Sequence, residues 1–199
     1  MKVLFFSDAH ADKKSIKKVI EKSRNADLLV CAGDLSMMEE GFGEMLEELK
    51  KVNKKILIIP GNNETPDFMD EGIDDYENII SIEDEIYQDM NIKFLGIGGS
   101  TITPFNTPYE LSEGEFRKKL SKYDNTITVL VTHSPAKDTK LDKTSTGLHV
   151  GSSAIREWVE ENQPKLHCCG HVHENAGKEE MIKNTLSFNP GAEGRIIKI

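Results

Sequence analysis

Three kinds of feature are scarce in this sequence, and each scarcity excludes a class of protein. No apolar run approaches the roughly 20 residues of a membrane-spanning helix, and the apolar start, which leads directly into Asp8, is too short for a signal peptide. Basic residues are outnumbered, with 25 Lys and Arg against 34 Asp and Glu and a net charge of −9. Because a long nucleic acid needs clustered cations, we expect neither a membrane nor a long nucleic-acid partner.

Cysteine is also scarce. The chain has only Cys31, Cys168 and Cys169, and no Cys-x-x-Cys spacing. An odd number of cysteines, two of them adjacent, favours reduced and buried thiols in a cytoplasmic protein. A zinc–thiolate site is the less favoured alternative. The sequence carries no signal for the oligomeric state.

The first third of the chain alternates predicted strands with predicted helices. Strands are expected at 2–7, 27–32 and 56–59, and helices at 13–24 and around 42–49. The second helix is indicated by apolar residues at i, i+3, i+4 and i+7 spacing from Phe42 to Leu49. These strands are continuous apolar runs for most of their length, and the strand at 56–59 is fully apolar, which predicts a parallel sheet that is covered on both faces.

The remainder predicts a second group of strands. Segments 78–88 and 92–98 are expected to form antiparallel strands, and 127–131 a further one. A capping-box pattern at Ser112 opens one helix, and another runs from about Ser153 to just before Pro164. Strands at 166–169, 180–188 and 194–199 are expected to complete the second group. We therefore predict an α/β fold, a four-layer αββα sandwich of two mixed β-sheets flanked by helices, as a single domain over residues 1–199.

Metal-ligating residue types follow the predicted strands. The groups are Asp8-Ala9-His10, Gly33-Asp34, Gly61-Asn62-Asn63-Glu64, Thr132-His133 and Gly170-His171-Val172-His173. Strand exits are where an α/β sheet gathers distant residues into one crevice. Carboxylates combined with imidazoles suit Mn, Fe, Co, Ni or Zn. Each group alone is commonly a turn, a cap or an ordinary loop histidine, so it is their joint occurrence at successive strand exits that indicates a metal centre.

Together these motifs resemble the calcineurin-like metallophosphoesterase superfamily, in particular its small prokaryotic single-domain phosphodiesterases. The resemblance spans residues 8 to 173. It implies that two divalent transition metal ions are bound, with manganese the first expectation and nickel, cobalt, zinc or iron the alternatives. It assigns one ion to Asp8, His10, Asp34 and His173, and the other to Asp34, Asn62, His133 and His171, with Asp34 bridging. The implied activity is hydrolysis of small phosphodiesters, nucleotides and cyclic nucleotides among them, by attack of metal-bound hydroxide.

Asn63 departs from the family pattern, which has a histidine at this position that is commonly assigned to leaving-group protonation. An amide cannot deliver a proton at neutral pH, and general acid catalysis is worth about 10²–10⁴-fold. The substitution therefore indicates lost activity, a substrate whose leaving group needs little protonation, or a replacement acid. His149, in a long loop after a ligand-bearing strand, is the replacement we hypothesise; a solvent-exposed loop histidine is the alternative.

Three further residues are hypothesised to bind substrate. Ser152 and Arg156 lie at the start of a predicted helix, where free N–H groups attract anions, although Ser153 could be a plain helix cap there. Phe105 could stack a nucleobase, or its loop could simply pack on its own sheet. A competing hypothesis for the whole chain is a catalytically weak, metal-binding scaffold of the same fold that serves protein interactions.

Overall fold

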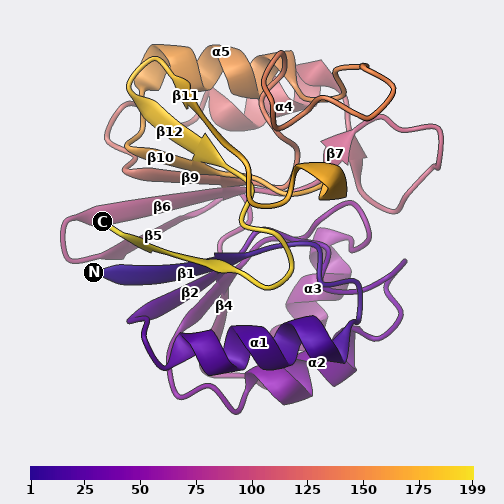
Figure 1. Ribbon diagram of the computed structural model, residues 1–199, viewed down its shortest axis with the longest axis vertical. Coiled ribbons are helices and arrows are strands. Elements are labelled where there is room, and N and C mark those ends of the chain that lie inside the picture. Colours follow the sequence, from indigo (N-terminus) through magenta and orange to yellow (C-terminus); the bar gives the residue numbers. More distant parts are fainter.

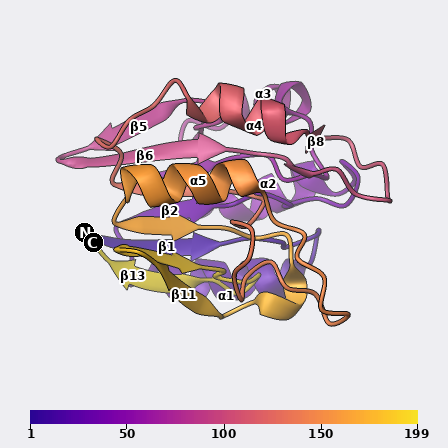
Figure 2. The same cartoon turned by 90° about the horizontal axis from the view of Figure 1, so that it is seen from above.

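Two β-sheets packed face to face form the centre of the computed structural model, which describes Met1–Ile199 (Figures 1 and 2). The first sheet has the strand order β13-β1-β2-β3-β4. Its members are β1 (Lys2–Phe6), β2 (Leu28–Cys31), β3 (Ile56–Ile58), β4 (Ile79–Ser81) and β13 (Arg195–Lys198). All neighbouring pairs are parallel except β13 with β1. The apolar strands thus form the parallel sheet that the sequence predicts.

The second sheet has the order β11-β12-β10-β9-β6-β5. Its members are β5 (Ile86–Asp89), β6 (Ile92–Ile97), β9 (Val129–Thr132), β10 (Leu166–Cys168), β11 (Glu179–Ile182) and β12 (Thr185–Phe188). Strands β6, β9, β10 and β12 run parallel to one another, and antiparallel strands close both edges. A short pair, β7 (Ser100–Thr101) with β8 (Glu110–Leu111), and the 3₁₀ turn His173–Asn175 lie outside both sheets.

Helices cover the outer faces of both sheets (Figure 1). On the first sheet these are α1 (Lys13–Ser23), α2 (Phe42–Leu49) and α3 (Pro66–Ile73); on the second they are α4 (Glu113–Leu120) and α5 (Ser153–Asn162). Apolar side chains fill the space between each sheet and its helices, and a third apolar cluster separates the sheets. In that central layer the rings of Phe5 and Phe188 pack edge to face, with their centroids 5.2 Å apart. The predicted αββα sandwich is confirmed.

Three strand assignments from the sequence are wrong. Segment 180–188 forms two antiparallel strands, β11 and β12, because the chain turns at Lys183 and Asn184. Segment 78–88 is not one strand: β4 extends the first sheet, whereas β5 belongs to the second. The chain crosses between the sheets there, and Glu83, whose side chain is 5% exposed, accepts hydrogen bonds from Tyr109 and Lys119, both at 2.8 Å. Strand β13 pairs with β1 in the first sheet and not with the second group. Its Ile197 packs into the layer between the sheets. Because both sheets face this layer, the apolar pattern of a strand does not show to which sheet the strand belongs.

Helix α3 was not predicted, although a signal for it is present. Thr65 accepts a hydrogen bond from the backbone N–H of Phe68, and Pro66 occupies the first turn. A threonine cap followed by proline is a common helix start. The eight-residue helix buries only Met69 and Ile73, so its apolar periodicity is too short to stand out.

The cysteines behave as predicted: all three are buried and unpaired. Burial raises the pKa of each thiol well above its usual value, so these side chains pack as small apolar groups. No helix combines the length and the apolar character that spanning a membrane would require.

Candidate metal centre

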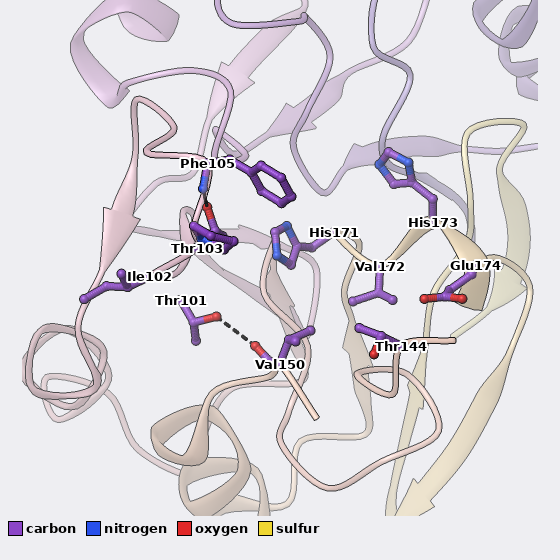
Figure 3. Close-up of a pocket in the computed structure, with 11 residues that line it drawn as sticks. Thr101, Ile102, Thr103, Phe105, Thr144, Val150, His171, Val172, His173 and Glu174 are labelled. Atoms are coloured by element: carbon purple, nitrogen blue, oxygen red, sulfur yellow. Dashed lines mark hydrogen bonds between the residues drawn. The ribbon is translucent and has the colours of Figure 1, made fainter. Parts of the chain in front are cut away.

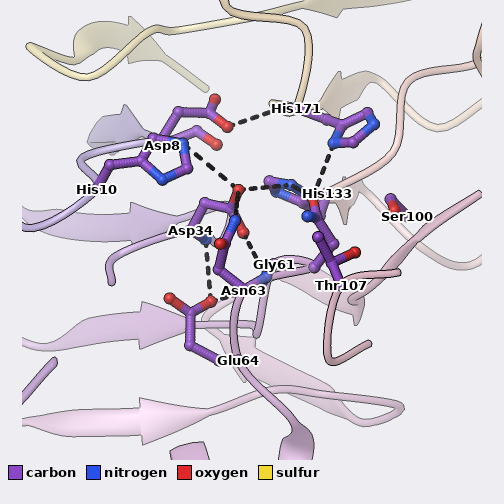
Figure 4. Close-up of polar contacts among 12 residues, drawn as sticks. Asp8, His10, Asp34, Gly61, Asn63, Glu64, Ser100, Thr107, His133 and His171 are labelled. Atoms are coloured by element: carbon purple, nitrogen blue, oxygen red, sulfur yellow. Dashed lines mark hydrogen bonds and ion pairs between the residues drawn. The ribbon is translucent and has the colours of Figure 1, made fainter. Parts of the chain in front are cut away.

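The predicted ligands converge because parallel strands of both sheets end at the same edge of the molecule (Figure 4). Asp8 follows β1 and Asp34 follows β2; His133 follows β9 and His171 lies just beyond β10. Asp8, Asp34 and His171 have positive φ angles of 59°, 53° and 70°. This left-handed backbone is unusual for residues other than glycine and collects at functional sites. Here it ends each strand with a sharp turn that brings the side chains together.

Two glycines make the close approach possible. A Cβ atom on Gly61 would lie 1.9 Å from Oδ1 of Asp34, and one on Gly170 would lie 1.9 Å from Oγ of Ser7. Both distances are far below van der Waals contact, so the backbone at these positions fits against its neighbours only without a side chain. The glycines of two motifs are therefore explained by packing around the carboxylates.

The first donor group consists of Asp8, His10, Asp34 and His173, whose ligand atoms all lie within 4.8 Å of one another. The Nε2 atoms of His10 and His173 are 2.8 Å apart. Oδ2 of Asp34 lies 3.5 Å from Nε2 of His10, and Oδ1 of Asp8 lies 3.6 Å from Nε2 of His173. Two imidazoles and two carboxylates that point at one small volume form a suitable cage for a divalent transition metal.

The second donor group is centred on the side-chain oxygen of Asn62. This Oδ1 lies 3.0 Å from Nε2 of His133 and 2.8 Å from Nδ1 of His171. Nε2 of His133 is also 3.4 Å from Oδ2 of Asp34. Because Nδ1 of His133 lies 2.8 Å from the carbonyl oxygen of Ala32, that ring is oriented with Nε2 toward Asp34. Oδ2 of Asp34 is thus close to both donor groups, as a bridging ligand must be.

The charges of the site favour a bound cation. Burial, the largest single effect, would lower the pKa of His133, but the charges of Asp34 and Asp8 and the hydrogen bonds to Asp34 and Ala32 together outweigh it and raise the pKa to about 9. Burial would likewise raise the pKa of Asp34, but the charges of His133 and His10 and the hydrogen bonds from His133 and Asn63 together outweigh it and hold the pKa well below its usual value. Oδ2 of Asp8 is buried with no hydrogen-bond partner. An acceptor without a donor is costly, and a metal ion would satisfy it. The residues therefore fit two divalent transition metal ions.

Glu64 holds the backbone around the metal ligands through hydrogen bonds, a role that was not predicted from the sequence. Its buried carboxylate accepts hydrogen bonds from the backbone N–H groups of Gly61 at 2.9 Å, Asp34 at 3.2 Å and Ser36 at 2.6 Å. It thereby ties the exits of β2 and β3 together. Burial, reinforced by the charge of Asp34, raises the pKa of Glu64 to about 7. Its place at the end of the third motif was the available signal.

Asn63 lies against the shared carboxylate. Its side-chain Nδ2 donates to Oδ2 of Asp34 at 2.7 Å, and its backbone N–H donates to Oδ1 of the same residue at 3.0 Å. The amide oxygen accepts from the backbone N–H of Met38 at 3.0 Å. The amide therefore links the carboxylate to the neighbouring loop through both of its polar atoms.

His149 is not brought to this group. Nδ1 of its ring lies 2.7 Å from Oδ1 of buried Asp142, and the side chain is one-third exposed. No contact joins it to a predicted metal ligand. Asp142 holds the His149 ring within the loop that carries both residues. The structure therefore gives no geometric support to the hypothesis that His149 is a replacement acid.

Ser152 and Arg156 are structural, which corrects their predicted role in substrate binding. Ser152 is the N-cap of α5, accepting from the N–H of Ile155. The carboxylate of Glu113 already occupies the helix start, accepting from Ser153 N at 3.0 Å and Ala154 N at 2.8 Å. Arg156 contacts Glu160 and two backbone carbonyls. The carboxylate of Glu113 therefore occupies the start of α5, where the substrate anion was predicted to bind.

Phe105 lies on an exposed loop. Its side chain is 79% exposed, so it does not pack on its own sheet. Together with His171 it lines a pocket beside the metal ligands (Figure 3).

Comparison with known proteins fits this geometry. The sequence model described as calcineurin-like phosphoesterase matches residues 1–175. This chain belongs to that family. Members of the calcineurin-like phosphoesterases use a dinuclear metal centre to hydrolyse phosphoesters, and the cluster of Asp8, His10, Asp34 and His173 is a candidate metal site in this chain.

Individual relatives support the same placement. An uncharacterized protein of Methanocaldococcus jannaschii, MJ1162, is 34% identical over 99% of this chain and 91% of its own length. The crystal structure of TT1561 of Thermus thermophilus covers 96% of this chain and 90% of that one, with a TM-score of 0.74 and 14% identity. A structure described as a novel archaeal phosphodiesterase covers 96% and 84%, with a TM-score of 0.52 and 19% identity. At these identities the two structures show a shared fold.

Proposed function

We propose that this calcineurin-like phosphoesterase hydrolyses small phosphodiesters with good leaving groups. The observation that carries the proposal is the position of Asp34, whose Oδ2 lies 3.5 Å from Nε2 of His10 and 3.4 Å from Nε2 of His133. One carboxylate oxygen is thus placed to join two complete donor groups. When bound there, two divalent ions, manganese being our first expectation, supply a hydroxide nucleophile and polarise the phosphoryl group.

The chain orients its ligands through outer contacts. Nδ1 of His10 lies 3.2 Å from the carbonyl oxygen of Ser36, and Nδ1 of His133 faces that of Ala32. In each ring the proton on Nδ1 is held by the backbone, so Nε2 is left to bind metal. Partners of this kind fix the tautomer of a ligating histidine and raise its affinity for metal.

The preference for good leaving groups rests on Asn63. Its amide holds no proton to give at neutral pH, and both of its polar atoms are engaged by Asp34 and Met38. A leaving group that departs as a stable anion, such as a nitrophenolate, needs no proton from the enzyme. The fold neighbour described as a phosphodiesterase is consistent with the proposed diester substrate.

Metal reconstitution tests the proposal. Metal-stripped protein is titrated with Mn²⁺, and hydrolysis of bis(4-nitrophenyl) phosphate is measured beside the amount of metal bound. We expect activity to rise with the second equivalent of metal and to return to background on chelation. Nickel, cobalt, zinc and iron are compared in the same way. Protein that binds two metal ions and yet cleaves neither this diester nor cyclic or dinucleotide diesters would overturn the proposal and favour the scaffold function.

A further inference from the structure

A pocket adjoins the metal ligands, and its lining is chemically one-sided. It has a volume of about 440 Å³, within the range of small-molecule sites. Two loops form its walls. The segment that carries the candidate metal ligands His171 and His173 forms a further side (Figure 3). The lining consists of residues 101–105, Thr144, Val150 and residues 171–174.

Apolar groups dominate the walls. Ile102 and Phe105 stand at the pocket with 73% and 79% of their surface exposed, although both are large apolar residues. Val150 and Val172 add further apolar surface. The lining contains no lysine or arginine, and its one carboxylate is that of Glu174. Away from the metal ligands, a second phosphate or carboxylate on a substrate would therefore find no lysine or arginine in this lining and would meet the carboxylate of Glu174.

The walls are already fixed in place. The hydroxyl of Thr101 donates to the carbonyl oxygen of Val150 at 2.7 Å, which joins the two loops. Glu110 accepts from the backbone N–H groups of Thr103 at 3.1 Å and Thr107 at 3.0 Å, which closes the turn that carries Phe105. On the opposite wall Glu174 accepts from the N–H of Ser145 at 2.8 Å. A preformed apolar cavity needs little ordering when a ligand enters.

We propose that this pocket binds an uncharged aromatic group of the substrate and discriminates against an anionic one. The inference rests on the proposed function, because the phosphoryl group must lie at His171 and His173 for its organic substituent to reach Phe105. The substrate class narrows accordingly to diesters with one uncharged aryl or heteroaryl substituent. Dinucleotides and esters with a terminal phosphate are disfavoured.

Phosphonates that cannot be hydrolysed test this without turnover. Methylphosphonate, phenylphosphonate and 4-carboxyphenylphosphonate are titrated into the manganese-loaded protein by calorimetry. We expect phenylphosphonate to bind at least about tenfold more tightly than methylphosphonate, because its ring buries apolar surface. The 4-carboxy group should remove most of this gain, because its charge meets the carboxylate of Glu174 in a wall without lysine or arginine.

Two variants and one control locate the effect. Phe105→Ala should reduce the preference for the phenyl group to less than about threefold and leave methylphosphonate binding unchanged. Glu174→Gln, whose amide oxygen can still accept from Ser145, should improve binding of the 4-carboxyphenyl compound severalfold and change the other two little. Met90→Ala is the matched control, since Met90 is also 79% exposed but lies at the turn between β5 and β6, outside the pocket lining.

The outcomes separate the two proposals. If methylphosphonate binds but phenylphosphonate binds no more tightly, or if Phe105→Ala leaves the preference intact, the pocket assignment is wrong while the phosphoesterase function stands. If no phosphonate binds the metal-loaded protein, both proposals fail. If the 4-carboxyphenyl compound binds as tightly as the phenyl compound, the proposed discrimination by charge is overturned.

Discussion

The two halves of the metal centre differ in how far each is assembled by the protein alone. In the half formed by Asn62, His133 and His171, both imidazoles meet one amide oxygen, and the side chain of His133 is fully buried. In the half formed by Asp8, His10 and His173, the side chain of His173 is 60% exposed. Here Nε2 of His10 lies 2.8 Å from Nε2 of His173, so two nitrogen atoms that can each bind a metal ion face each other.

The difference indicates a division of labour. The buried half is part of the packed core, because His133 lies between the two sheets with hydrogen-bond partners on both ring nitrogens. The exposed half has fewer protein partners and an unsatisfied oxygen on Asp8. We therefore expect a metal ion to organise the exposed half, whereas the protein itself organises the buried one. Asp34 connects the two.

The largest effect should come from removing that connection. Asp34→Asn keeps the size of the side chain and removes its charge, so neither half retains its shared ligand. We expect metal content to fall from two ions to one or fewer and kcat/KM on bis(4-nitrophenyl) phosphate to fall more than about 100-fold, beyond the loss typical of an outer-shell partner. Circular dichroism checks folding. A variant that keeps both ions and its activity would show that Asp34 does not bridge.

Single histidine variants should separate the two halves by stability. In metal-free protein His133→Ala leaves the buried charge of Asp34 without its partner, and breaking such a pair costs about 3–5 kcal/mol. His173→Ala removes a side chain that is mostly exposed, so its cost should stay within about 0.5 kcal/mol. Urea unfolding of both variants without metal measures the contrast. Equal destabilisation by the two substitutions would contradict the proposed difference between the buried half and the exposed half.

Much of this comparison could be predicted from the sequence, but not all. The ligands were predictable because each follows an apolar strand, and strand exits meet at one sheet edge. Which half is buried was not, because burial of His133 depends on packing between two sheets that are distant in sequence. The role of Ser152 was mispredicted for a similar reason. A serine before a helix indicates an anion site or a cap equally well, and the choice depends on Glu113 arriving from α4, about forty positions away.

The Asn63 substitution tests the chemistry at the carboxylate that both halves share. Asn63→His introduces a group that can donate a proton at neutral pH, so hydrolysis of diesters with poor leaving groups should improve by at least about tenfold, at the low end of general acid catalysis. Esters with good leaving groups should change little. The measurement is the dependence of kcat on leaving-group pKa for both proteins. Parallel dependences would remove the general-acid explanation of Asn63.

His167 lies behind the buried half, is no metal ligand, and should affect stability and not activity. Its Nε2 is 2.9 Å from the hydroxyl of Thr132, and its Nδ1 is 2.7 Å from that of Ser187. Because the Thr132 hydroxyl donates to the carbonyl oxygen of Ser134, the ring must donate from Nε2 and accept at Nδ1. His167 is therefore a neutral imidazole with a defined tautomer, and its hydrogen bond to Thr132 supports the end of β9, directly before His133.

This arrangement has a consequence for stability at acidic pH. Burial lowers the pKa of His167 from 6.5 to about 3, so between these values the unfolded chain takes up a proton that the folded chain does not. Stability should accordingly fall as the pH drops below 6.5, by at most about 1.4 kcal/mol per pH unit from this residue. His167→Gln, which cannot titrate, should show a shallower decline in urea unfolding between pH 6.5 and 4.5. Since other groups titrate equally in both proteins, the difference between the two slopes isolates His167, and coincident slopes would show that it is protonated in the folded state.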